Sequence, residues 1–142
     1  VKEGAKLLIG GKRLTSQEHS KGFFLEPTIF TDVTPDMKIA QEEIFGPVLS
    51  IIHVHDFDDA VEVANKIEFG LSASVFTTSL PRAFEFIHRV QAGVVKVNKP
   101  TTGLEFQVPF GGYKRSSYGD IKEQGETALD FYSKLKTVYL GY

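Results

Sequence analysis

Residues 41–51, QEEIFGPVLSI, hold the residue types in this chain that are best suited to binding a ligand. Glu43 and Phe45 flank a single residue and lead into a Gly-Pro pair, which predicts a turn followed by an apolar strand. This order would place a hydrogen-bond acceptor and an aromatic face together at a strand edge, where they could clamp a sugar ring and a flat heterocycle. From residue types alone, a surface acid at a helix end and a core Phe are the more common interpretation.

A second candidate site lies in residues 99–117, a segment rich in Thr, Gly and Pro. A connection of this length inside a compact domain is uncommon unless it is functional, so we treat it as a candidate functional loop. The large apolar residues of the loop include Leu104 and Phe110. From the loop alone, Phe110 could equally well fill the core.

His53 and His55 are two residues apart on a predicted strand and would therefore share one face. This spacing is compatible with a pair of metal ligands, but no third ligand is evident. Solvated histidines on a strand face are far more common, so we expect no metal site.

The segments that must position these residues alternate between predicted strands and helices. Short strands are expected within residues 1–33. A Thr-Pro-Asp run at residues 34–36 supplies a cap, a Pro at the first helical position and an acid in the first turn. It predicts a helix over residues 35–42, which Pro47 separates from a strand over residues 48–54.

Asp56 is expected to cap a second helix, because apolar residues follow it at helical spacing. That helix should run through Lys66 and end near Gly70. An apolar run then predicts a buried strand over residues 73–77.

Ser79 and Pro81 are expected to open a third helix, and Gly93 is expected to end it in a left-handed conformation. A strand over residues 94–97 should follow. The expected apolar face of the helix consists of Ala83, Phe84, Ile87 and Val90.

The alternation of strands and helices between residues 48 and 98 predicts the fold class. Such an order requires crossover connections, so the three strands should run parallel with right-handed crossovers. The fold class is therefore α/β. A last helix is expected over residues 126–135, which would complete a domain of residues 1–135, and a terminal strand over residues 136–142.

The composition is that of an ordinary α/β domain and argues against several kinds of partner. The chain has 142 residues, of which 42% are hydrophobic and 24% charged, enough for one core. A net charge of −2, with neither sign gathered in a tail, indicates no nucleic-acid or membrane-surface partner. No apolar run is long enough for a membrane span. The absence of Cys excludes a disulfide framework and fits an expected cytoplasmic location.

The motif at residues 41–51 and four others closely resemble the carboxyl-terminal part of the NAD(P)-dependent aldehyde dehydrogenases. The motifs appear in the order that this family uses and together cover nearly the whole chain. The four are GAKLLIGG at 4–11, GFFLEPTIF at 22–30, AGVVKVN at 92–98 and PFGGYKRSS at 109–117.

The resemblance implies a place in a larger enzyme. The fold would be the C-terminal part of the aldehyde dehydrogenase catalytic domain, with residues 136–142 as an oligomerisation strand. That family works through a Cys nucleophile and a Glu base, and the matching motifs lie downstream of both. Because the chain has no Cys, we interpret it as a C-terminal piece that has no turnover alone.

The resemblance also assigns roles to the residues of the candidate sites. Glu43 would bind the ribose hydroxyls beside the nicotinamide of NAD or NADP, and Phe45 would pack against the nicotinamide ring. Leu104 and Phe110 would line the aldehyde pocket on a loop that closes the entrance tunnel. Lys99 and the Thr pair at residues 101–102 could meet a carboxylate or hydroxyl at the far end of the aldehyde.

Residues 114–125, KRSSYGDIKEQG, depart from the family pattern. Ser117 replaces a Gly, Asp120 and Ile121 are extra, and Lys122 stands where Arg is usual. Because Lys cannot make a bidentate guanidinium contact, subunit contacts that use that Arg are in doubt. The Ser-Ser-Tyr-Gly run itself resembles the branch that acts on the semialdehyde of 2-oxoglutarate.

Two functions from different classes follow. The first is a C-terminal part of an enzyme that oxidises an aldehyde, or more narrowly a semialdehyde, to a carboxylic acid with NAD(P). This enzyme is expected to form a homo-oligomer, a dimer or tetramer, through the terminal strand. The alternative is a stand-alone, non-catalytic α/β binding or assembly module. A longer reading frame with an upstream nucleophilic Cys would distinguish the two.

Overall fold

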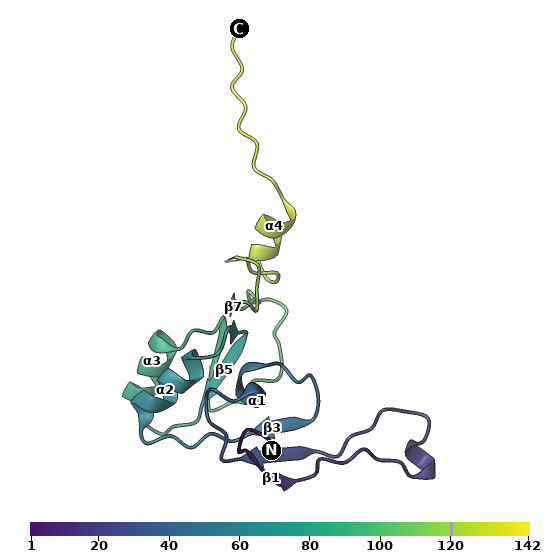
Figure 1. Cartoon of the computed structure of the whole chain (residues 1–142). Helices are drawn as coiled ribbons and strands as arrows, with labels where there is room; N and C mark the ends of the chain where they lie inside the picture. The colour runs from purple at the N-terminus through teal and green to yellow at the C-terminus, as the bar shows by residue number, and fades with distance from the viewer. Residues whose placement is uncertain (120) are drawn as a thin grey trace. The chain divides into compact units, whose positions relative to one another are not determined.

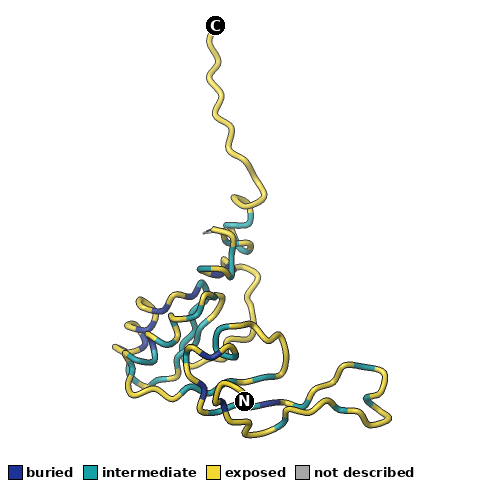
Figure 2. Tube along the Cα trace, viewed as in Figure 1, coloured by how far each residue is buried: buried dark blue, intermediate teal, exposed yellow. Residues whose placement is uncertain are grey.

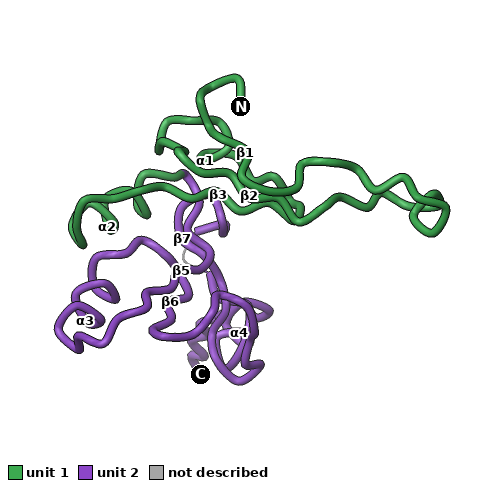
Figure 3. The backbone as a smooth tube through the Cα atoms, turned by 90° about the horizontal axis from the view of Figure 1, so that it is seen from below, with its two compact units in different colours: residues 1–67 green, residues 68–142 purple. Residues whose placement is uncertain are grey.

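The computed structural model describes residues 1–119 and 121–142. These residues divide into two compact units, Val1–Ile67 and Glu68–Tyr142, which Figure 3 draws in different colours. Each unit combines short strands and helices, in agreement with the predicted α/β class.

The first unit is built on a three-stranded sheet (Figure 1). Strand β2 (Thr28–Thr31) lies at its centre, antiparallel to β1 (Lys6–Ile9) and parallel to β3 (Val48–Ser50). The segment between β1 and β2 returns as a long hairpin arm that carries the short 3₁₀ helix η1 (Gln17–His19). The core of this unit is small: Ala5, Val33 and Met37 are buried, and Phe30, Ile39, Ala40 and Ile52 pack against them.

Helix α1 (Lys38–Gln41) is shorter than the predicted range of residues 35–42. It begins three residues later and ends one residue earlier. Residues 34–37 form a turn closed by a hydrogen bond from the Met37 N–H to the Thr34 carbonyl. Met37 has an extended backbone, with φ −68° and ψ 144°, and its side chain is buried with Ala5 and Val33. Packing of this side chain therefore outweighs the local helix signals.

Helix α2 (Phe57–Asn65) confirms the predicted cap. The Asp56 carboxylate accepts a hydrogen bond from the Asp59 N–H at 2.9 Å. The Asp59 carboxylate in turn accepts from the His55 N–H at 2.9 Å, so two donors at the helix start are satisfied. The helix ends at Asn65, and not near Gly70, whose backbone belongs to the next strand.

The second unit contains two small sheets. Strands β5 (Ser72–Val75) and β6 (Val94–Val97) are parallel and are joined through α3 (Leu80–Arg89), as the crossover argument requires. Strands β4 (Phe69–Gly70) and β7 (Tyr113–Lys114) are antiparallel. The bounds predicted for β6 are confirmed, and β5 begins one residue earlier and ends two residues earlier than expected.

The predicted three-stranded parallel sheet is wrong. Strand β3 pairs with β2, whereas β5 and β6 pair with each other, so β3 is not in their sheet. Two consecutive strands joined by a helix need not share a sheet when another strand is available as the partner of the first. Here β2 supplies the parallel neighbour of β3. Strand β3 also ends at Ser50, four residues before the predicted end.

Helix α3 begins as predicted, with the Ser79 hydroxyl accepting a hydrogen bond from the Arg82 N–H. Its predicted apolar face is confirmed in part. Ala83 and Val90 are buried, but Phe84 and Ile87 are exposed and Phe86 is buried in their place. The prediction for Gly93 is also wrong, because the helix ends at Arg89 and the φ of Gly93 is not positive. Gly93 is needed for space: a Cβ there would overlap the carbonyl oxygen of Gly111.

The C-terminal segment differs most from the prediction. Helix α4 (Thr127–Tyr132) ends three residues early, at an extended Ser133. Residues 136–142 form no strand and are exposed throughout, and Figure 1 shows them as an extended chain. A strand needs a neighbour for its backbone hydrogen bonds, and this segment has none among the described residues.

Buried positions are few in both units, as the dark blue segments of Figure 2 show. Large apolar side chains are exposed in every part of the chain, among them Phe23 at 91% and Phe106 at 84%. No helix among residues 1–119 and 121–142 is long and apolar enough to cross a membrane.

Candidate functional site

Glu43 and Phe45 lie in the exposed connection between α1 and β3. Phe45 has a left-handed backbone, with φ +53°, and its side chain is 90% exposed. Glu43 is also exposed and makes no hydrogen bond or ion pair with any described residue. A hydrogen bond fixes the end of this connection to the sheet: the Pro47 carbonyl accepts from the Thr28 N–H of β2 at 2.8 Å.

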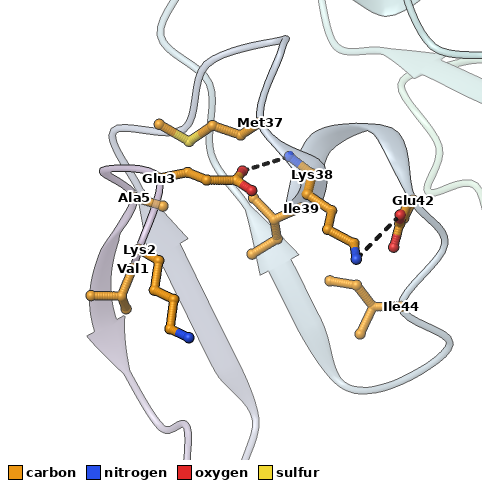
Figure 4. A pocket seen from close by; sticks show the side chains of 9 residues that line it. All are labelled: Val1, Lys2, Glu3, Ala5, Met37, Lys38, Ile39, Glu42 and Ile44. Atoms are coloured by element: carbon orange, nitrogen blue, oxygen red, sulfur yellow. Dashed lines mark hydrogen bonds and ion pairs between the residues drawn. The ribbon is translucent and has the colours of Figure 1, made fainter.

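A hollow of about 350 Å³ lies beside this connection in the first unit. Figure 4 shows two interactions among its lining residues: the Glu3 carboxylate accepts from the Lys38 backbone N–H at 2.7 Å, and the Lys38 ammonium forms an ion pair with Glu42 at 3.5 Å. Its other lining residues include the apolar Ala5, Met37, Ile39 and Ile44. Neither Glu43 nor Phe45 lines this hollow.

The second unit brings Leu104 and Phe110 together. Both line two adjoining hollows, of about 390 and 330 Å³, which also share Val94 and Gly103. Leu104 is 50% exposed and Phe110 is half-buried. The loop thus presents an apolar surface to an open space and does not bury Phe110 fully in the core.

Polar residues of the same loop line these hollows. Lys99 and Glu105 line the larger hollow, and Thr101 and Thr102 line the smaller one. Gln124 also lines the larger hollow, and its side-chain oxygen is buried without a hydrogen-bond partner. The site therefore combines an apolar wall with groups that can donate to or accept from a polar ligand.

Hydrogen bonds fix the start of the loop. Asn98, at φ +54°, accepts from the Thr77 N–H at 2.8 Å and donates to the Thr77 carbonyl at 2.9 Å. The Ser74 hydroxyl donates to the Lys99 carbonyl at 2.5 Å. The loop therefore leaves β6 in a defined direction.

Residues of the segment 117–123 fix the end of the loop. The Ser117 hydroxyl accepts from the Gly112 N–H at 2.7 Å, and the Lys122 ammonium donates to the Gly111 carbonyl at 2.5 Å. The Glu123 N–H donates to the Phe110 carbonyl at 2.8 Å. Ser117 and Lys122 thus make contacts within the chain. Asp120 lies outside the described residues.

The sequence analysis missed Lys96, which also lines the larger hollow. Its ammonium donates to the carbonyls of Thr102 and Gly103, at 2.8 and 2.6 Å. The signal that could have revealed it is a charged residue inside the strand Val94–Val97, whose other members are all Val.

His53 and His55 are both exposed. In the described part of the chain, no three His, Cys, Asp or Glu side chains gather closely enough to hold a metal ion. The pair therefore has no third ligand among the described residues.

Comparison with known proteins identifies the family. Residues 1–138 match the aldehyde dehydrogenase family. The chain belongs to that family. The alpha-ketoglutarate semialdehyde dehydrogenase of Haloferax volcanii is 55% identical over 140 residues, which are 99% of this chain and 29% of the relative. The chain therefore spans less than a third of the length of this curated relative.

Solved aldehyde dehydrogenase structures share the fold. The NAD-dependent aldehyde dehydrogenase of Sinorhizobium meliloti matches with a TM-score of 0.88 and 45% identity, over 98% of this chain and 26% of that one. The betaine aldehyde dehydrogenase of Staphylococcus aureus, solved in complex with NAD+, matches with a TM-score of 0.86 and 34% identity, over 92% of this chain and 25% of that one.

Proposed function

We propose that this chain is the C-terminal part of an enzyme that oxidises a semialdehyde to a carboxylic acid with NAD or NADP. The observation that carries the proposal is the loop of residues 99–110, where Leu104 and Phe110 line one hollow with Lys99. An apolar wall with a cation nearby suits an aldehyde whose chain is apolar and whose far end carries a carboxylate. The 55% identity to a semialdehyde dehydrogenase supports the same substrate class.

Glu43 and Phe45 are proposed to bind the nicotinamide half of the cofactor, which accepts the hydride when bound. The residues present fit such a group. Glu43 is an exposed carboxylate without a partner in the described residues, so both of its oxygens can accept from vicinal ribose hydroxyls. Phe45 exposes an aromatic ring to which a flat heterocycle can bind. The NAD+ complex of the Staphylococcus relative supports NAD as the cofactor.

The remaining polar residues of the loop are proposed to select the substrate tail. The Lys99 ammonium would attract a terminal carboxylate, and the hydroxyls of Thr101 and Thr102 would donate hydrogen bonds to it. The nucleophile and the general base are proposed to come from a part of the enzyme that this chain does not include, since the chain has no Cys. The comparisons favour this enzyme over a stand-alone binding module, because the matched relatives are named for aldehyde oxidation.

A series of unbranched aldehydes of increasing length tests the role of the loop in the full-length enzyme. Leu104→Ala is expected to lower kcat/KM for long aldehydes more than for short ones, by about tenfold, because a missing apolar contact changes discrimination by roughly 1–3 kcal/mol. Leu135→Ala is the matched control, since Leu135 is fully exposed and lines neither hollow. An equal loss for every aldehyde would mean that Leu104 is structural.

A further inference from the structure

Lys96 is an unusual residue for its position. It lies in β6 between two Val residues and is half-buried. Lysines in such positions normally have a carboxylate partner. Here the ammonium instead donates to two successive backbone carbonyls, of Thr102 at 2.8 Å and Gly103 at 2.6 Å. No carboxylate among the described residues pairs with it.

The two carbonyls lie directly before Leu104 in the sequence. The backbone turns at Gly103, which has φ +87°. No atom lies within 4 Å of the position that a Cβ of Gly103 would occupy, so side-chain packing does not hold this turn in place. The bonds to Lys96 connect the turn to β6. They therefore define where the loop holds Leu104 relative to Val94 and Phe110, which line the same hollows.

We propose that Lys96 is a positioning residue for substrate selection: its ammonium fastens residues 102–103 to β6 and thereby sets the depth of the aldehyde pocket at Leu104. This inference rests on the proposed function of the loop. The inference goes beyond that function because it assigns part of the discrimination between aldehydes to Lys96. The Lys96 ammonium bonds backbone carbonyls of the protein and is not itself assigned a contact with the substrate. The charge matters because hydrogen bonds from an ammonium to carbonyls are stronger than bonds between neutral groups.

Lys96→Met in the full-length enzyme removes the three donors and keeps an unbranched side chain. Two results are expected. Amide hydrogen exchange of peptides covering residues 99–108 should become about tenfold faster, because the loop opens more readily. The ratio of kcat/KM between long and short unbranched aldehydes should fall by about tenfold.

Two variants serve as controls. Lys96→Arg keeps a cation with several N–H donors and should restore both the slow exchange and the aldehyde ratio to within about threefold of the original. Lys134→Met removes an exposed Lys that has no partner in the described residues, and should change neither readout. If Lys96→Met does not fold, Lys96→Val, which matches the neighbouring residues of β6 and also lacks the donors, is judged by the same two measurements.

The outcomes separate this inference from the proposed function. Unchanged exchange in residues 99–108, or an equal loss for all aldehydes, would overturn the role of Lys96 while leaving aldehyde oxidation in place. An original enzyme that oxidises no aldehyde would overturn the proposed function. Faster exchange throughout the chain, in place of a local effect, would show that Lys96 is merely structural.

Discussion

At the scale of a single residue, Phe45 combines a strained backbone with an exposed aromatic ring. Its left-handed backbone costs about 1 kcal/mol or more for a residue with a Cβ, and its exposed ring gains nothing in return within the chain. Strain of this kind concentrates at ligand sites. The sequence motif predicted that Phe45 is a binding residue, but it did not predict the left-handed backbone.

Asp32 and Lys6 form an exposed ion pair at 2.7 Å, and Asp32 too has a left-handed φ of +54°. The hydrogen bond from the Lys6 ammonium, together with its charge, lowers the pKa of Asp32. The ion pair therefore stabilises the folded chain at pH values above the ordinary pKa of an Asp. This stabilisation is lost as the pH falls through the lowered pKa of Asp32, where the carboxylate becomes protonated.

Lys6→Met is expected to raise the pKa of Asp32 towards its ordinary value, because both the hydrogen bond and the charge are removed. NMR titration of the Asp32 carboxylate measures the change, with Lys2→Met as the control. High salt should reduce the difference, since the pair is exposed. An Asp32 pKa that does not respond to Lys6→Met would contradict the assigned cause.

At the scale of helices and strands, the sequence was most informative where a signal acts over a few residues. The caps at Asp56 and Ser79 and the bounds of β6 are confirmed, because each depends on local hydrogen bonds or on a continuous apolar run. The pairing of β3 with β2 and the late start of α1 depend on contacts between distant residues. No local pattern encodes those contacts.

The cap at Asp56 allows a direct test at this scale. Asp56→Ala should lower the free energy of unfolding by about 0.5–2 kcal/mol, because the Asp59 N–H loses its acceptor at the start of α2. Chemical denaturation measures the loss. Glu62→Ala is the control, since Glu62 is exposed in the same helix, and it should change stability far less. Equal effects of the two substitutions would argue against capping.

The whole chain exposes more large apolar side chains than a stable monomer usually does, including Val138, Leu140 and Tyr142 in the C-terminal segment. These three alternate with Thr137, Tyr139 and Gly141, which is the period of a strand. We therefore expect that residues 136–142 become ordered as a strand when they pair with another subunit.

Light scattering after size exclusion tests this expectation on the 142-residue chain and on a chain that ends at Leu135. The longer chain is expected to form dimers or larger oligomers, and the shorter one to dissociate, because the pairing segment is gone. A monomer for the longer chain, or an oligomer that survives the deletion, would show that this segment is not the interface.

The central claim is that this chain supplies part of the active site of an aldehyde dehydrogenase, and hydride transfer in the full-length enzyme tests it most directly. Stopped-flow measurement of NADH formation compares the original enzyme with Glu43→Gln and with the neighbouring control Glu42→Gln. An error of about 1 Å in the position of a reacting group can cost ~100-fold in rate, so Glu43→Gln should slow hydride transfer substantially without lowering stability. Glu42→Gln, which removes only an exposed ion pair with Lys38, should leave the rate unchanged. Equal hydride-transfer rates in all three enzymes would contradict the claim.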